Sequence, residues 1–278
     1  MAEGSEAYIE SPSIFNGGGI LNLNGSVITG TDKKSGREYL TNTDNTIEGA
    51  GRIEFNLILK NDASGVIDAD VKGKLTLAVW KLTISNAGLV EATGDGVCEI
   101  KSAVDNTGTL EAAGGTLKLV ATVTGSGAVA VAAGSVVITN TRAKEAISFT
   151  GQSGTLELDQ SQTYSGDVEG FSLTGQTTLD LRDIGFVSPN EATFSGTANS
   201  GVLTVTDGTH TAQITLLGDY TGSTFVASSD GKGGVDIVDA SAQAPSVTHF
   251  AIAMATLGDT WRPRRIGGRV DRCWGDSG

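Results

Sequence analysis

Two successive segments decide the fold: Gly88-Leu-Val-Glu-Ala-Thr-Gly-Asp-Gly-Val-Cys-Glu-Ile100 and Gly108-Thr-Leu-Glu-Ala-Ala-Gly-Gly-Thr-Leu-Lys-Leu119. Each contains two copies of one short pattern, which is glycine, any residue, apolar, polar, apolar. Residues two apart on a strand point to the same side, so each copy predicts a short strand with one buried side and one polar side. The second copy starts seven or eight residues after the first, which leaves room for a single bend.

The pattern recurs along much of the chain. First copies start at position 51 and then at 65, 88, 108, 127 and 154, and the last four intervals are 23, 20, 19 and 27 residues. A third apolar alternation, such as Leu82-Thr83-Ile84, precedes the next first copy, so three strands fit into each repeat. Such a repeat is typical of a solenoid in which each coil stacks on the next. We expect the inward column of first strands to be Ile67, Val90, Leu110, Val129 and Leu156.

The repeat predicts an all-β fold: a right-handed parallel β-helix with about 20 residues per coil, followed by a β-rich C-terminal cap with a hairpin. Strands at 202–205 and 212–216, joined through Asp207-Gly208, form the expected hairpin. A β-sandwich is the alternative fold, but it would not predict a fixed repeat spacing. The expected divisions are an N-terminal strand-rich lead-in or cap of the solenoid (1–44), the coils (45–160), a closing module (161–240) and a disordered, arginine-rich tail (241–278).

Glycine and asparagine supply the expected corners of the coils. The chain has 39 glycines, and a tight corner needs a positive φ or a close approach that glycine accepts most easily. Asn61, Asn86 and Asn106 each precede a first-strand glycine by two to four residues. We therefore expect these asparagines to lie at corners as well.

Composition excludes several classes of protein. The 278 residues carry a formal net charge of −13, which disfavours binding to nucleic acid. No uncharged apolar run reaches the roughly 20 residues of a membrane helix, so we expect no membrane insertion. The acidic start, residues 1–7, shows no cleavable signal peptide. Cys98 and Cys273 are too few for a disulfide framework or a zinc site, and Cys98 is expected to be buried on the same face as Ile100.

The stretch 201–239 carries a family resemblance. It contains Gly201-Val-Leu-Thr-Val-Thr-Asp-Gly-Thr-His-Thr-Ala212, then Leu217-Gly-Asp-Tyr220 and Ser228-Ser-Asp-Gly-Lys-Gly-Gly234. Together with the coils before it, this stretch resembles the C-terminal portion of large β-strand repeat proteins of bacterial surfaces and secretions, which are adhesin-like, haemolysin-type or autotransporter-passenger-like chains. The resemblance covers about residues 45–240 and implies a β-helix module of a secreted or surface-displayed bacterial protein.

The outward positions of the pattern form the one repeated set of ionisable residues: Glu54, Asp68, Glu91, Glu111 and Glu157. Coils that stack in register would place Asp68, Glu91 and Glu111 in an acidic ladder with neighbours about 5 Å apart. Such a ladder has three interpretations. It is a solvated face that blocks aggregation, a weak calcium site, or the acid/base pair of a glycosidase. We favour the solvated face, because charge runs are usually solvated.

A second calcium candidate lies near the end of the expected cap. Gly231-Lys-Gly-Gly-Val-Asp-Ile-Val-Asp239 matches a calcium-binding nonapeptide except at Lys232, which replaces a glycine. Asp230 and Asp236 are its candidate ligands, but we favour a turn followed by an edge strand, because calcium sites of this kind need ligands from stacked neighbouring copies and no further copy follows. We expect no other metal, no catalytic residues and no cofactor besides calcium.

These features favour a non-enzymatic structural or adhesive β-helix module that is secreted or displayed on a bacterial surface. A host surface or an extracellular polysaccharide is the expected partner. The first alternative is a polysaccharide-active β-helix enzyme, either a lyase or a glycosidase, that uses the acidic ladder. The second alternative is a calcium-stabilised secretion module.

Overall fold

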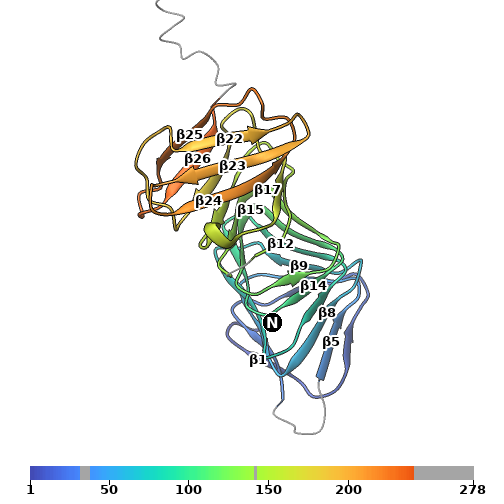
Figure 1. The fold of residues 1–278 in the computed structure, drawn as a ribbon. Coiled ribbons are helices and arrows are strands. Elements are labelled where there is room, and N and C mark those ends of the chain that lie inside the picture. Colours follow the sequence, from blue (N-terminus) through green and yellow to red (C-terminus); the bar gives the residue numbers. More distant parts are fainter. Residues whose placement is uncertain (32–37, 141–142, 241–278) are drawn as a thin grey trace, which may run out of the picture. The chain divides into compact units, whose positions relative to one another are not determined.

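The computed structural model describes residues 1–31, 38–140 and 143–240, which lie within one compact unit, Met1–Ala242. These residues form a parallel β-solenoid of about 8 turns with about 21 residues per turn (Figure 1). The predicted all-β solenoid is therefore confirmed. The described residues include a short 3-10 turn at Ser161–Thr163 but no helix long and apolar enough to cross a membrane. The predicted tail, 241–278, lies outside the described residues.

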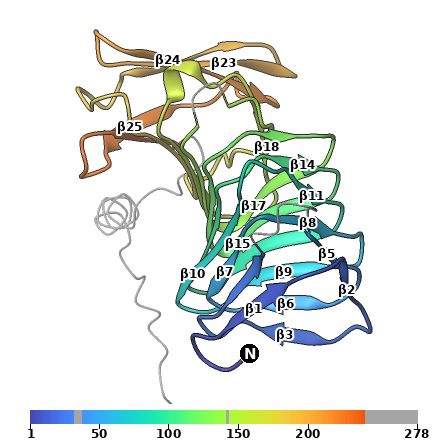
Figure 2. The same ribbon diagram turned by 90° about the horizontal axis from the view of Figure 1, so that it is seen from below.

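The coils pass through three rows of parallel strands, of which the third ends at β16 (Figure 2). The first row contains β3 (Ile20–Asn22), β6 (Thr46–Glu48), β9 (Val66–Ala69), β12 (Leu89–Thr93), the first halves of β15 (Thr109–Leu119) and β17 (Ala128–Ile138), β18 (Ile147–Phe149) and β20 (Asp167–Glu169). The second row contains β1 (Glu6–Ile9), β4 (Val27–Gly30), β7 (Gly51–Phe55), β10 (Gly73–Val79), β13 (Gly96–Ile100), the second halves of β15 and β17, β19 (Gly154–Leu158) and β21 (Thr177–Leu181). The third row contains β2 (Ser13–Phe15), β5 (Glu38–Asn42), β8 (Leu57–Asn61), β11 (Ile84–Asn86), β14 (Val104–Asn106) and β16 (Val123–Thr124).

Alternation within the strands decides which side chains fill the interior. In the first row, Ile67, Val90 and Leu110 are paired in register and are almost fully buried. Burial of each such side chain contributes about 1.5 to 3 kcal/mol. Cys98 on β13 is buried as predicted, and burial raises the pKa of its thiol to about 12. This cysteine is therefore an unreactive core residue.

The predicted inward column is wrong at its last member. In the first row Val129 is followed by Ile147, whereas Leu156 pairs with Val136 in the second row. The strand that starts at Gly51 likewise lies in the second row, beside β10. The glycine pattern starts strands of both rows, because both rows are entered through bends. The pattern alone therefore does not assign a strand to its row.

The coils extend beyond the predicted 45–160 span at both ends. Parallel pairing starts with β1 and β4 and continues to the pair β19 and β21. The early strands lack the full glycine pattern, but they bury alternating apolar residues such as Ile9 and Ile28. Alternation is what stacking requires, so these segments join the solenoid without the motif.

Antiparallel hairpins close the C-terminal end of the solenoid. The cap contains β22 (Ala192–Gly196), β23 (Ser200–Thr206), β24 (Thr211–Leu217), β25 (Phe225–Ser229) and β26 (Val235–Asp239). The predicted hairpin is confirmed as β23 and β24, and β24 continues the first row by pairing with β20. Strand β26 continues the second row by pairing antiparallel with β21. Buried aromatic rings pack together here: Phe171 stacks on Phe225 with centroids 6.2 Å apart, and the tilted ring of Tyr220 lies 6.1 Å from Phe225.

A ladder of buried amides runs along the third row. The strands β5, β8, β11 and β14 all end in a buried asparagine, and these four residues are Asn42, Asn61, Asn86 and Asn106. The Nδ2 of each donates to the Oδ1 of the next over 2.9, 2.9 and 2.8 Å. The backbone turns tightly after each amide, and a Cβ at Gly108 would overlap the carbonyl oxygen of Gly88. Asn61, Asn86 and Asn106 lie at corners as predicted, and Asn42 joins them, but all four side chains point inward and form hydrogen bonds with one another.

Candidate functional site

Four carboxylate side chains point outward from successive strands of the first row. We call them the acidic row, and they are Glu48, Asp68, Glu91 and Glu111. Asp68 is paired in register with Glu48 and with Glu91, and Glu91 is paired with Glu111. The structure thus brings together the three predicted ladder residues and adds Glu48 at one end. The other two predicted outward residues, Glu54 and Glu157, lie on β7 and β19 in the second row.

Like charges on successive coils shape the electrostatics of the acidic row. Burial raises the pKa of Asp68, although hydrogen bonds from the Thr93 hydroxyl at 3.0 and 2.9 Å oppose the shift. Burial is the main cause of the raised pKa of Glu91, and the negative charges of Asp68 and Glu111 raise it further. No described residue forms an ion pair with the four carboxylates of the row. The row is therefore a strongly anionic face.

The cap places the two remaining calcium candidates in different surroundings. Asp230 is ion-paired with Arg182 and accepts hydrogen bonds from the backbone N–H groups of Lys232 and Gly234 at 2.7 and 2.8 Å. Asp236 lies on β26, between Asp180 and the strand β25. Among the described residues, no group of three or more His, Cys, Asp or Glu side chains is arranged to hold a metal ion. Calcium at these positions stays a prediction.

A carboxyl cluster with one buried member, Asp180, joins the solenoid to the cap. Glu157, Asp180 and Asp236 are paired in register on β19, β21 and β26. Asp180 is only 7% exposed, and its Oδ1 has no hydrogen-bond partner among the described residues. Burial, Asp236 and Glu157 raise the pKa of Asp180 to about 7, against the opposing effect of Arg182. The sequence analysis missed this cluster, because it depends on the pairing of β21 with the distant β26.

We expect the stability of the protein to rise as the pH falls from about 8 to about 5. Asp180 binds its proton near pH 7 in the folded state but at an ordinary pKa of 3.8 when unfolded. Its stabilising contribution is therefore present at acidic pH and is lost as the pH rises through about 7. Asp180→Asn should flatten this dependence and stabilise the protein by about 1 to 2 kcal/mol at pH 8. Thermal melting at a series of pH values measures both effects, and parallel curves for the two proteins would contradict the assignment.

A second surface feature lies at the corner between the second and third rows. Trp80 is 58% exposed and Phe55 is 40% exposed, and their rings stack with centroids 5.9 Å apart and planes inclined by 12°. The Lys81 ammonium lies 4.9 Å from the Trp80 ring centroid. We call Phe55, Trp80 and Lys81 the aromatic ledge. The sequence analysis missed it, although the position of Trp80 between two predicted strands, at a corner of the coil, could have indicated an exposed ring.

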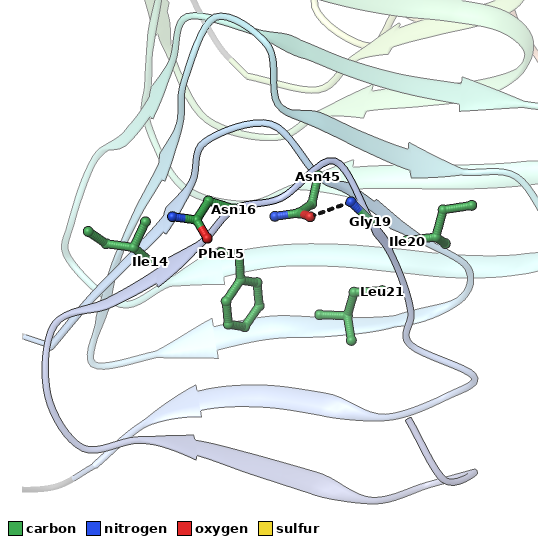
Figure 3. A pocket seen from close by; sticks show the side chains of 7 residues that line it. All are labelled: Ile14, Phe15, Asn16, Gly19, Ile20, Leu21 and Asn45. Carbon is green, nitrogen blue, oxygen red and sulfur yellow. Dashed lines mark hydrogen bonds between the residues drawn. The ribbon is translucent and has the colours of Figure 1, made fainter.

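The N-terminal end of the solenoid contains an apolar cavity of about 280 Å³. Phe15 and Leu21 line it from β2 and β3, with Ile14 and Ile20 on its flanks (Figure 3). Asn45 closes one side by accepting a hydrogen bond from the Gly19 N–H at 2.6 Å. The cavity is open to solvent on the side of the exposed Ile14 and Ile20, and none of the residues that line it is charged.

Comparison of the chain with protein-family models found no match. Comparisons with curated proteins and with solved structures also found no significant similarity.

Proposed function

We propose that this protein is a non-enzymatic structural or adhesive β-solenoid module of a secreted or surface-displayed bacterial protein. In this role the coils hold a binding surface at a fixed place, and the partner is a host surface or an extracellular polysaccharide. The class of bacterial repeat protein that the stretch 201–239 resembles supports the same role.

The observation that carries the proposal is the repetition of side chains in register on successive coils. The amide ladder repeats inside the solenoid, and the acidic row repeats on its outer face. A stacked array of this kind transmits rigidity from coil to coil, because each coil contacts its neighbours along its whole length. A rigid stack of coils suits a module that holds a binding surface in place, and the acidic row keeps one face of the stack solvated.

The acidic row fits a passive face better than it fits a catalytic pair. A glycosidase needs one carboxyl to donate a proton and another to act from the opposite side of the substrate. Here the carboxylates lie side by side on one flat sheet, and both Asp68 and Glu91 have raised pKa values for the same main reason, which is burial. Their surroundings therefore do not divide them into an acid and a base.

Incubation with acidic and neutral polysaccharides tests this proposal. We expect the purified protein to bind to cell surfaces or to an immobilised polysaccharide without changing the polymer. New reducing ends and unsaturated products are measured over time. Reproducible turnover that is lost in Glu91→Gln would overturn the non-enzymatic function and support a polysaccharide-active enzyme.

A further inference from the structure

We propose that the aromatic ledge is the glycan-contacting site of the module and that it takes an acidic polysaccharide chain, of the uronic acid type. The inference rests on the proposed adhesive function and adds to it a site and a ligand class.

The first argument is the shape of the corner. Four residues, 80–83, separate β10 from β11, but only three, 101–103, separate the corresponding strands β13 and β14. The longer corner therefore stands out beside the shorter one. A cavity of about 410 Å³ lies between them, lined by residues that include Trp80, Lys81 and Lys101. It is large enough to hold one or two sugar rings.

The second argument is that strained backbone conformations occur at the residues that hold the aromatic rings in solvent. Phe55 and Lys81 have positive φ angles of 70° and 53°, which are rare for side chains of this size. Apart from Asn24, they are the only described non-glycine residues with positive φ. The two strained residues flank the one exposed tryptophan of the described chain. Backbone strain and solvent-exposed aromatic rings both oppose stability, so their coincidence points to binding.

The third argument is charge complementarity. Lys74 and Lys101 both contact Glu99, at 3.1 Å each, and Lys81 lies over the Trp80 ring. The ammonium groups of Lys81 and Lys101 therefore both lie at the cavity, and no carboxylate is among the residues that line it, in a chain with a net charge of −13. The acidic row lies on the first row of strands, away from this corner. A polyanion is therefore repelled by the first row and attracted to the ledge.

An acidic sugar can contact both the aromatic ring and the lysines of the site. The C–H face of a pyranose ring is apolar and packs on an exposed indole ring. A uronate carboxylate can pair with Lys81 or Lys101 at the edge of the same ring. A neutral glucan would satisfy only the indole ring, and an acidic peptide would satisfy only the lysines.

Binding to polygalacturonate, dextran and poly-L-glutamate tests the proposal by titration calorimetry. We expect polygalacturonate to bind most tightly, with Trp80→Ala weakening it about tenfold and Trp80→Phe restoring most of the affinity. Lys101→Gln should weaken binding and reduce its dependence on salt. Phe186→Ala removes an exposed ring that follows β21 near the cap, several coils away from the ledge, and should change nothing.

Two results would overturn the assignment. One is equal affinity of Trp80→Ala and the unaltered protein for polygalacturonate. The other is equally tight binding of poly-L-glutamate, which would indicate a charge effect without sugar recognition. Circular dichroism and melting of each variant show whether it is folded. Attachment that survives Trp80→Ala leaves the adhesive function in place and removes only the ledge, whereas release of products removes the non-enzymatic function.

Discussion

Asn86→Leu is expected to lower the free energy of unfolding by about 3 to 5 kcal/mol. Asn86 lies in the middle of the amide ladder and is fully buried. Its Oδ1 accepts from Asn61, and its Nδ2 donates to Asn106 and to the carbonyl oxygens of Gly88 and Thr109. Leucine has a similar branched shape but no polar atoms. Buried groups on both neighbouring coils therefore lose a hydrogen bond, which costs more than a solvated bond would.

Urea unfolding followed by circular dichroism measures this effect. Asn199→Leu is the matched control, because Asn199 is exposed in the turn between β22 and β23. The control should change stability by less than about 0.5 kcal/mol. Similar midpoints for the two variants would show that the ladder does not stabilise the solenoid.

Leu110→Asp is expected to prevent folding or to cost more than about 4 kcal/mol, whereas Glu111→Lys, one residue further along, should be nearly neutral. Leu110 is fully buried between Val90 and Val129 of the neighbouring coils. A carboxylate there has no partner in the apolar interior. Glu111 points outward beside Glu91, so a lysine at this position replaces a repulsive pair by an attractive one.

The yield of soluble protein and its melting temperature separate the two variants. We expect Glu111→Lys to melt within a few degrees of the unaltered protein, or slightly higher, because the repulsion from Glu91 is removed. Equal destabilisation by both substitutions would contradict the register of β15.

The periodicity of the sequence predicted much of this fold, because the conditions for a stacked strand are met within a few consecutive residues. A strand that stacks on both sides needs alternating side chains and a sharp bend at each end, and both are visible in residues 88–119. The hairpin of β23 and β24 was predictable for the same reason, since Asp207-Gly208 specifies the turn between them. Cys98 was placed correctly by alternation alone.

The candidate site was predictable only in part. Asp68, Glu91 and Glu111 were found because they share one position in one repeat. Glu54 and Glu157 share the same pattern but lie in the second row, since the pattern does not distinguish the two bends of a coil. The ledge depends on the corner after β10, which is one residue longer than the corner after β13. This difference in length could not be recognised before the structure showed that the two corners are neighbours.

The short repeat of glycine and alternating apolar residues was by itself enough to determine that this chain forms a parallel β-solenoid, because alternation and tight bends are properties of a few consecutive residues. Only the tertiary structure decided which coil positions become neighbours. Stacking turned corner asparagines into a buried amide ladder, and it set Asp180 against Asp236. It also left Trp80 exposed beside Lys81 and Lys101. These outcomes depend on contacts between residues about one coil or more apart, and such contacts follow from register across the whole solenoid.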